Sequence, residues 1–73
     1  MIEINRYYEV ITDAWRHFRK YAEQIPLSDQ VWVEEIDEKA ALIDKHTGCR
    51  RLALKLMTQI EDELEQLDRE AKR

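Results

Sequence analysis

The sequence predicts an all-α fold, a small antiparallel three-helix bundle whose helices run up, down and up in one domain. Apolar residues recur at spacings of three and four along most of the 73 residues, as one face of an α-helix requires. The chain has one Gly and one Pro, so we expect few turns and few, long helices. Hydrophobic residues make up 44% and charged residues 38%, a combination typical of helical bundles.

The first expected helix covers residues 4–25, and its broad apolar face dominates the prediction. This face contains Ile4, Tyr7, Tyr8, Ile11, Ala14, Trp15, Phe18, Tyr21, Ala22 and Ile25. Because so wide a face suits a helix that touches two neighbours, we expect both other helices to cover it, with Trp15 as a core anchor. Pro26 disfavours a helical Ile25 and ends the helix.

The second expected helix covers residues 29–46 and carries most of the acids, with Ser28 or Asp29 as its cap. Its narrow apolar stripe consists of Trp32, Val33, Ile36, Ala40, Ile43 and Thr47. The acids that lie off this stripe are Glu34, Glu35, Asp37 and Glu38. We therefore expect the helix to lean one face on the first helix and to present an acidic back to solvent. Gly48, free to adopt a positive φ without strain, is expected to end it.

The third expected helix covers residues 49–71 and follows the second after a very short linker, which makes the two antiparallel neighbours. Its main apolar face consists of Leu52, Ala53, Leu56, Ile60, Leu64, Leu67 and Ala71. Leu54 and Met57 project away from that face and Leu64 borders it, so the three residues form a second apolar strip. The alternative architecture is a helical hairpin that completes its core by forming a homodimer.

Charge and apolar content restrict the partners and the compartment. The net charge of −4 disfavours direct nucleic-acid binding, which depends on clustered Lys and Arg, and favours partners with a basic surface. The chain begins without a secretion signal and has no run of ~20 apolar residues, so no membrane association is expected. Cys49 is the single cysteine, which favours a reducing, cytoplasmic location.

Two short acidic motifs are the clearest candidates for chemistry. Glu35-x-x-Glu38 and Glu65-x-x-Asp68 together resemble the carboxylate pattern of the all-α, magnesium-dependent nucleotide pyrophosphohydrolases, which implies a metal that bridges substrate phosphates. Projected on helices, however, all four carboxylates turn away from the buried faces, whereas metal ligands in a bundle converge on its interior. We therefore interpret them as solvated and assign no catalytic, cofactor-binding or metal-binding residue.

Asp13 and His17 stand one turn apart on the first helix, and we expect them to form a surface ion pair. His46 lies at the opposite end of a helix and is not expected to join them. Trp32, like Trp15, is expected to be a core anchor.

The run INRYYEVITDAWRHFRKYA, a Ser-Asp cap, a Trp and an acidic second helix are together similar to short, uncharacterised helical proteins of phages and mobile elements of Gram-positive bacteria. The resemblance implies a protein that binds and modulates a host protein. We accordingly expect a non-enzymatic interaction protein that docks on a partner or on itself. The apolar contact would come from Leu54, Met57 and Leu64, and the steering charge from Glu34, Glu35, Asp37 and Glu38. The alternatives are the magnesium-dependent hydrolase and a structural accessory subunit of a larger assembly.

Overall fold

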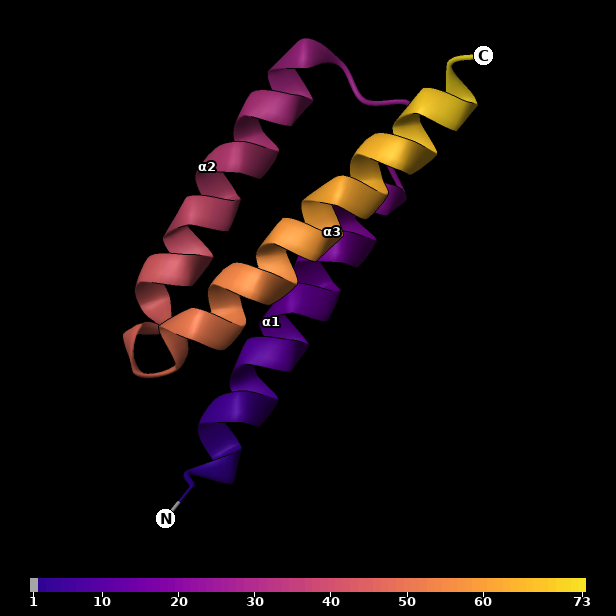
Figure 1. The fold of residues 1–73 in the computed structure, drawn as a ribbon. Coiled ribbons are helices and arrows are strands. Elements are labelled where there is room, and N and C mark those ends of the chain that lie inside the picture. The colour runs from indigo at the N-terminus through magenta and orange to yellow at the C-terminus, as the bar shows by residue number, and fades with distance from the viewer. Residues whose placement is uncertain (1) are drawn as a thin grey trace.

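The protein folds into three α-helices in the computed structural model, which describes residues 2–73 (Figure 1). Helix α1 spans Ile4–Ala22, α2 spans Asp29–Lys45 and α3 spans Arg50–Ala71, with a 3₁₀ turn, η1, at Thr47–Cys49. No strand occurs in the part of the chain that the structure describes. The predicted all-α, three-helix architecture is confirmed.

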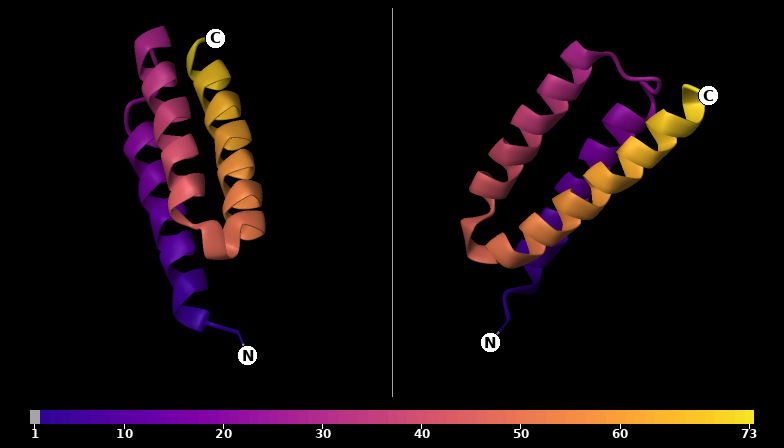
Figure 2. Two further views of the ribbon diagram at one scale, coloured as in Figure 1. Left: turned by 90° about the vertical axis from the view of Figure 1, so that its left-hand side faces the viewer. Right: turned by 45° about the horizontal axis from the view of Figure 1, so that its top comes forward.

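The helices form an elongated bundle with extents of 48 × 18 × 16 Å. Helices α1 and α3 run in the same direction along one another, and α2 runs back beside them (Figures 1 and 2). In all three views the start of α1 extends past the connection between α2 and α3. The first turns of α1 therefore lie beyond the hairpin that the other two helices make.

Helix α1 ends at Ala22, three residues before the expected end. The backbone N–H groups of Glu23, Gln24 and Ile25 still donate to carbonyls of the last turn, at Arg19, Tyr21 and Ala22. A residue before proline is disfavoured in the helical region, so the chain leaves the helix before it reaches Pro26. The proline has the predicted effect, but it acts on more residues than expected.

The caps of α2 follow the expectation at one end only. The Ser28 Oγ accepts a hydrogen bond of 3.3 Å from the Val31 N–H, so Ser28 is the N-terminal cap. Gly48 does not adopt a positive φ, and that expectation is wrong. The chain turns instead through η1, where the Cys49 N–H donates to the His46 carbonyl at 3.0 Å.

The core follows the line where α3 meets α1, and it combines small side chains with larger ones. One cluster contains Val10, Cys49 and Ala53, with Leu52 and Leu56 packed against it. A second joins all three helices through Ala14, Ile43 and Met57, with Leu42, Leu56 and Ile60 against it. The predicted main face of α3 thus lies in the core, apart from the exposed Ala71.

The apolar face of α1 is not covered as predicted. Ile4, Tyr8, Ile11 and Trp15 are 74%, 69%, 55% and 58% exposed, and we call these four residues the outer stripe. The buried residues of α1 are Val10, Ala14, His17 and Tyr21, at one edge of the predicted face. The expectation that two neighbouring helices cover the whole face is wrong, and so is the assignment of Trp15 to the core.

Helix α2 also differs from its predicted stripe. Val33 and Ile36 are exposed, whereas Ile43 is buried between the other helices and Trp32 is partly buried. The face that α2 turns inward mixes apolar and charged side chains, with the entirely buried Glu35 at its centre. Hydrophobicity alone therefore does not explain how α1 and α2 are rotated.

Candidate functional site

The candidate site is the outer stripe of α1, a row of apolar side chains that faces solvent. Its members follow one another at spacings of four, three and four residues, and the half-buried Phe18, Ala22 and Ile25 continue the alternation. This average of 3.5 residues is the period with which α-helices pack side chains into the holes of a facing helix. Among residues 2–73, no other helix covers the exposed first half of this row.

The outer stripe points away from the bundle because of the rotation of α1. At 100° per residue, the centre of the outer stripe lies roughly 120° around the helix from the buried row of Val10, Ala14, His17 and Tyr21. The buried row contains one His and one Ala, whereas the outer stripe contains two Ile and one Trp. The more apolar side of α1 is therefore the one left in solvent.

With this rotation, α1 packs Val10 and Ala14 towards α3 and makes polar contacts with α2. The His17 Nε2 lies 2.8 Å from the Glu35 Oε2, and both side chains are entirely buried. One turn further along, the Tyr21 hydroxyl and the Lys20 Nζ both donate to the Glu38 Oε2, at 2.6 and 2.9 Å. These contacts hold one side of α1 against α2.

A second acidic contact lies near the other end of α2. The Asp13 Oδ2 is 2.7 Å from the His46 Nε2 and accepts a hydrogen bond of 2.9 Å from the Lys45 Nζ. The expected surface pair of Asp13 with His17 is wrong, because each residue finds a partner across the α1–α2 contact. The expectation that His46 stays apart is wrong for the same reason.

The polar pairs and the outer stripe make opposing demands on the rotation of α1. Leaving a buried charge without its partner costs several kcal/mol, and burying one Ile side chain contributes about 1.5–3 kcal/mol, so the four side chains of the outer stripe together are comparable with the polar pairs. Turning α1 so that the outer stripe entered the core would separate His17 from Glu35 and Asp13 from His46. The rotation that satisfies the polar groups therefore leaves the outer stripe exposed.

The pKa values along this contact change in different directions. Burial raises the pKa of Glu35, and the hydrogen bond with His17 only partly opposes this. Burial would also raise the pKa of Asp13 and of Glu38, but their hydrogen bonds hold both below the ordinary range. Burial and the hydrogen bond to Glu38 raise the pKa of Tyr21, so it stays protonated as the donor.

Acidification is expected to destabilise the fold through Asp13 and Glu38. A group whose folded-state pKa is lowered stabilises the fold above its ordinary pKa of about 4, and this stability disappears as the pH falls through the lowered value. Glu35, whose pKa is raised, acts in the opposite sense and partly offsets the loss of stability.

We expect Asp13→Asn to reduce the stability of the fold by about 1–2 kcal/mol at pH 7, because it weakens charged hydrogen bonds. Near pH 3 the stability of the variant should approach that of the wild type.

Thermal unfolding followed by circular dichroism between about pH 7 and pH 3 measures this effect, and Asp37→Asn, at an exposed acid of α2, is the matched control. An Asp13→Asn variant that stays equally destabilised at pH 3, or a control that behaves like it, would contradict the assignment.

The predicted apolar strip of α3 is divided between surface and core. Leu54 is 49% exposed, as expected, but Met57 is 3% exposed and Leu64 is entirely buried. Met57 packs against Ala14 and Ile43, so it lies where all three helices meet. The strip is wrong as an exposed surface because α3 has a neighbour on each side and uses both apolar edges.

The four predicted steering acids of α2 also separate. Glu34 and Asp37 are exposed, in agreement with an acidic back. Glu35 is buried against His17, and the partly buried Glu38 is engaged by Tyr21 and Lys20. The assignment of Glu35 and Glu38 to the solvated back is wrong, because α2 turns both carboxylates towards α1.

Three of the four carboxylates of the hydrolase-like pattern have structural contacts, whereas Glu65 is exposed as expected. The buried Asp68 accepts hydrogen bonds from the Leu27 N–H at 2.7 Å, the Trp32 Nε1–H at 3.2 Å and the Lys72 Nζ at 2.8 Å. It thereby joins the α1–α2 connection to the end of α3, and its interpretation as solvated is wrong. In the described chain, no three His, Cys, Asp or Glu side chains gather where they could hold a metal ion.

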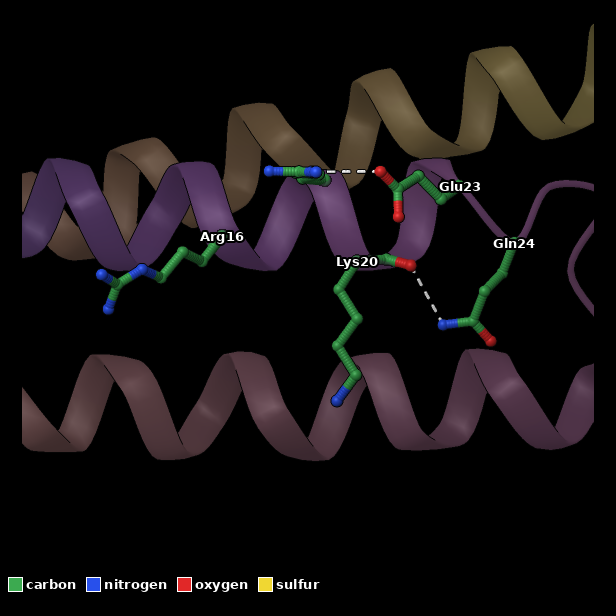
Figure 3. A pocket seen from close by; sticks show the side chains of 5 residues that line it. Arg16, Lys20, Glu23 and Gln24 are labelled. Atoms are coloured by element: carbon green, nitrogen blue, oxygen red, sulfur yellow. Dashed lines mark hydrogen bonds and ion pairs between the residues drawn. The ribbon is translucent and has the colours of Figure 1, made fainter.

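A basic hollow lies at the end of α1 (Figure 3). It is lined by Arg16, Arg19, Lys20, Glu23 and Gln24. Two of its cations are engaged within the chain: the Arg19 Nε donates to the Glu23 Oε1 at 3.0 Å, and Lys20 donates to Glu38. Arg16 remains on the flank of α1 next to the outer stripe.

No family model, curated protein or solved structure matches this chain. Within residues 2–73, none of the helices is long and apolar enough to cross a membrane.

The outer stripe, which the sequence prediction placed in the core, was nevertheless detectable in the sequence. Its alternating spacing of four and three continues from Ile4 to Ile25 and is separate from the row that includes Val10 and Ala14.

Proposed function

We propose that the chain is a helical protein–protein interaction module that binds an amphipathic partner helix on the outer stripe of α1. The exposure of Ile4, Tyr8, Ile11 and Trp15 at coiled-coil spacing is the observation that supports this proposal. Helix-in-groove recognition uses apolar anchors at this spacing. The partner surface expected from sequence thus moves from α3 to α1.

The size of the exposed surface supports the same proposal. Aromatic side chains bury roughly 150–250 Å² each, so the exposed parts of two aromatic residues and two isoleucines present on the order of 500 Å². Contiguous apolar patches larger than a few hundred Å² on a small protein mark interaction sites. Trp and Tyr are also enriched where partners contribute most of the binding energy.

The acids of α2 add a charge preference to the proposed contact. Glu34 and Asp37 are exposed, so a partner with a basic surface would approach more readily.

Site-specific photo-crosslinking in living cells tests the proposed function. A photoreactive phenylalanine analogue such as p-benzoylphenylalanine is placed at Tyr8 or at Trp15, and in the control at Val33, which is exposed and apolar on α2. We expect covalent protein adducts from the two positions of the outer stripe and not from the control, with each adduct identified by mass spectrometry.

The adducts are then compared in a chain that also carries Ile11→Asp. A charge in the middle of the outer stripe is expected to abolish them, because it would be buried without a partner in the complex. Equal adduct yields at positions 8 and 33, or yields that Ile11→Asp leaves unchanged, would rule out the outer stripe as the contact surface.

A further inference from the structure

We propose that the partner helix is α1 of a second copy of this chain, antiparallel to the first across a two-fold axis. This inference rests on the proposed function and names its partner. A two-fold contact presents the same surface on both copies, so the surface must complement itself in apolar pattern, charge and access. The outer stripe and its flanks meet each of these requirements.

The apolar pattern is complementary to itself in one antiparallel register. In antiparallel coiled coils the two alternating positions of the repeat face one another, and one register aligns the six stripe positions between residues 4 and 22 in that way. The layers pair Ile4 with Ala22, Tyr8 with Phe18 and Ile11 with Trp15, and symmetry repeats each pair. The half-buried continuation of the outer stripe thus faces its most exposed part.

The charges beside the outer stripe favour the antiparallel orientation. Glu9 and Arg16 lie two turns apart on the flank away from α3, and both are exposed. Neither forms an ion pair within residues 2–73. The antiparallel register places Glu9 of each copy at the level of Arg16 of the other, on the same side of the contact, so two pairs of opposite charges attract one another across it. A parallel dimer would place like charges at the same level.

The shape of the molecule leaves room for a second copy. The start of α1 extends past the α2–α3 connection (Figure 2). Along the rest of α1 the outer stripe lies roughly 120° around the helix from the buried row, so a second helix can lie on that side. Two outer stripes together bury on the order of 1,000 Å², at the lower limit of specific interfaces. We therefore expect a weak, reversible dimer with a dissociation constant on the order of 100 µM.

Sedimentation equilibrium of the purified chain, from about 10 µM to about 1 mM, measures the mass across this range. We expect the mass to rise from one copy to two. Arg16→Glu should weaken the dimer roughly threefold to tenfold, because it replaces two attractions between opposite charges by two repulsions between like charges. The double variant Glu9→Arg with Arg16→Glu should restore it, which separates charge pairing from loss of folding.

Cysteine cross-linking tests the orientation in a Cys49→Ala background. Thr12 lies close to the two-fold axis, so Thr12→Cys should form a disulfide between copies. Tyr8→Cys should not, because the antiparallel register separates the two copies of this position by about ten residues, or roughly 15 Å. A Tyr8→Cys chain that cross-links readily while Thr12→Cys does not would establish a parallel contact and overturn the proposed arrangement.

The outcomes separate this inference from the proposed function. A chain that is monomeric at every concentration and forms no disulfide between copies would overturn the dimer. If the photoreactive group at position 8 then yields adducts with another protein, the interaction module stands without self-association. If position 8 yields no more adducts than position 33, both proposals fail.

Discussion

Replacing His17 with alanine is expected to destabilise the protein by about 3–5 kcal/mol, because it leaves the Glu35 carboxylate buried without its partner. Both side chains are entirely buried, so water does not reach the site to compensate. A chain of 73 residues has a total stability of about 4–11 kcal/mol. Urea unfolding at one fixed protein concentration, followed by circular dichroism at 222 nm, measures the loss.

The matched control replaces both partners with leucine. His17→Leu together with Glu35→Leu is expected to be neutral or stabilising, because apolar residues of similar volume often replace a buried ion pair without loss. The His17 Nδ1 and the Glu35 Oε1 have no hydrogen-bond partner in the described chain, which adds to the cost of burying the pair. A double variant less stable than His17→Ala would refute this account of the pair.

Leu64→Ala is expected to destabilise the protein by about 2–5 kcal/mol, because it opens a cavity around an entirely buried side chain. Leu54→Ala, ten residues earlier on the same helix, is expected to stay within about 0.5 kcal/mol of wild type, because Leu54 is half exposed. The same urea titration measures both variants. Equal losses at the two positions would contradict the division of this predicted strip between core and surface.

Much of the fold was predictable because it depends on local pattern. Spacings of three and four, one Pro and one Gly were enough to place three helices. Pro26 acts on its neighbours, so the end of α1 was accurate to within three residues. Ser28 was correctly expected among the caps of α2 because capping involves only the next few residues.

The rotation of α1 was not predictable from its apolar pattern. Ranking by hydrophobicity places Ile11 and Trp15 in the core ahead of His17, yet the structure buries His17. The deciding contacts join residues far apart in the sequence, such as His17 with Glu35 and Asp13 with His46. Periodicity along one helix contains no information about these pairings.

The predicted site on α3 was wrong for a related reason. Helical projection correctly separated Leu54 and Met57 from the main apolar face, but it could not show that α2 covers Met57. Likewise, Glu35 lay about a quarter turn from the expected stripe of α2, and pairing with His17 brought it inside. Burial here depends on which helix lies opposite each face.

The polar contact between α1 and α2 has a consequence for the energy of the lone chain. The rotation that joins His17 and Asp13 to their partners turns the most apolar side of α1 outward. The isolated molecule therefore lacks the stability that burial of this side would supply. A sequence able to bury this side of α1 within its own bundle would be more stable as a monomer. It would then expose little apolar surface for a partner. Association through the outer stripe and stability of the monomer are thus opposed in this molecule, and the rotation of α1 favours association.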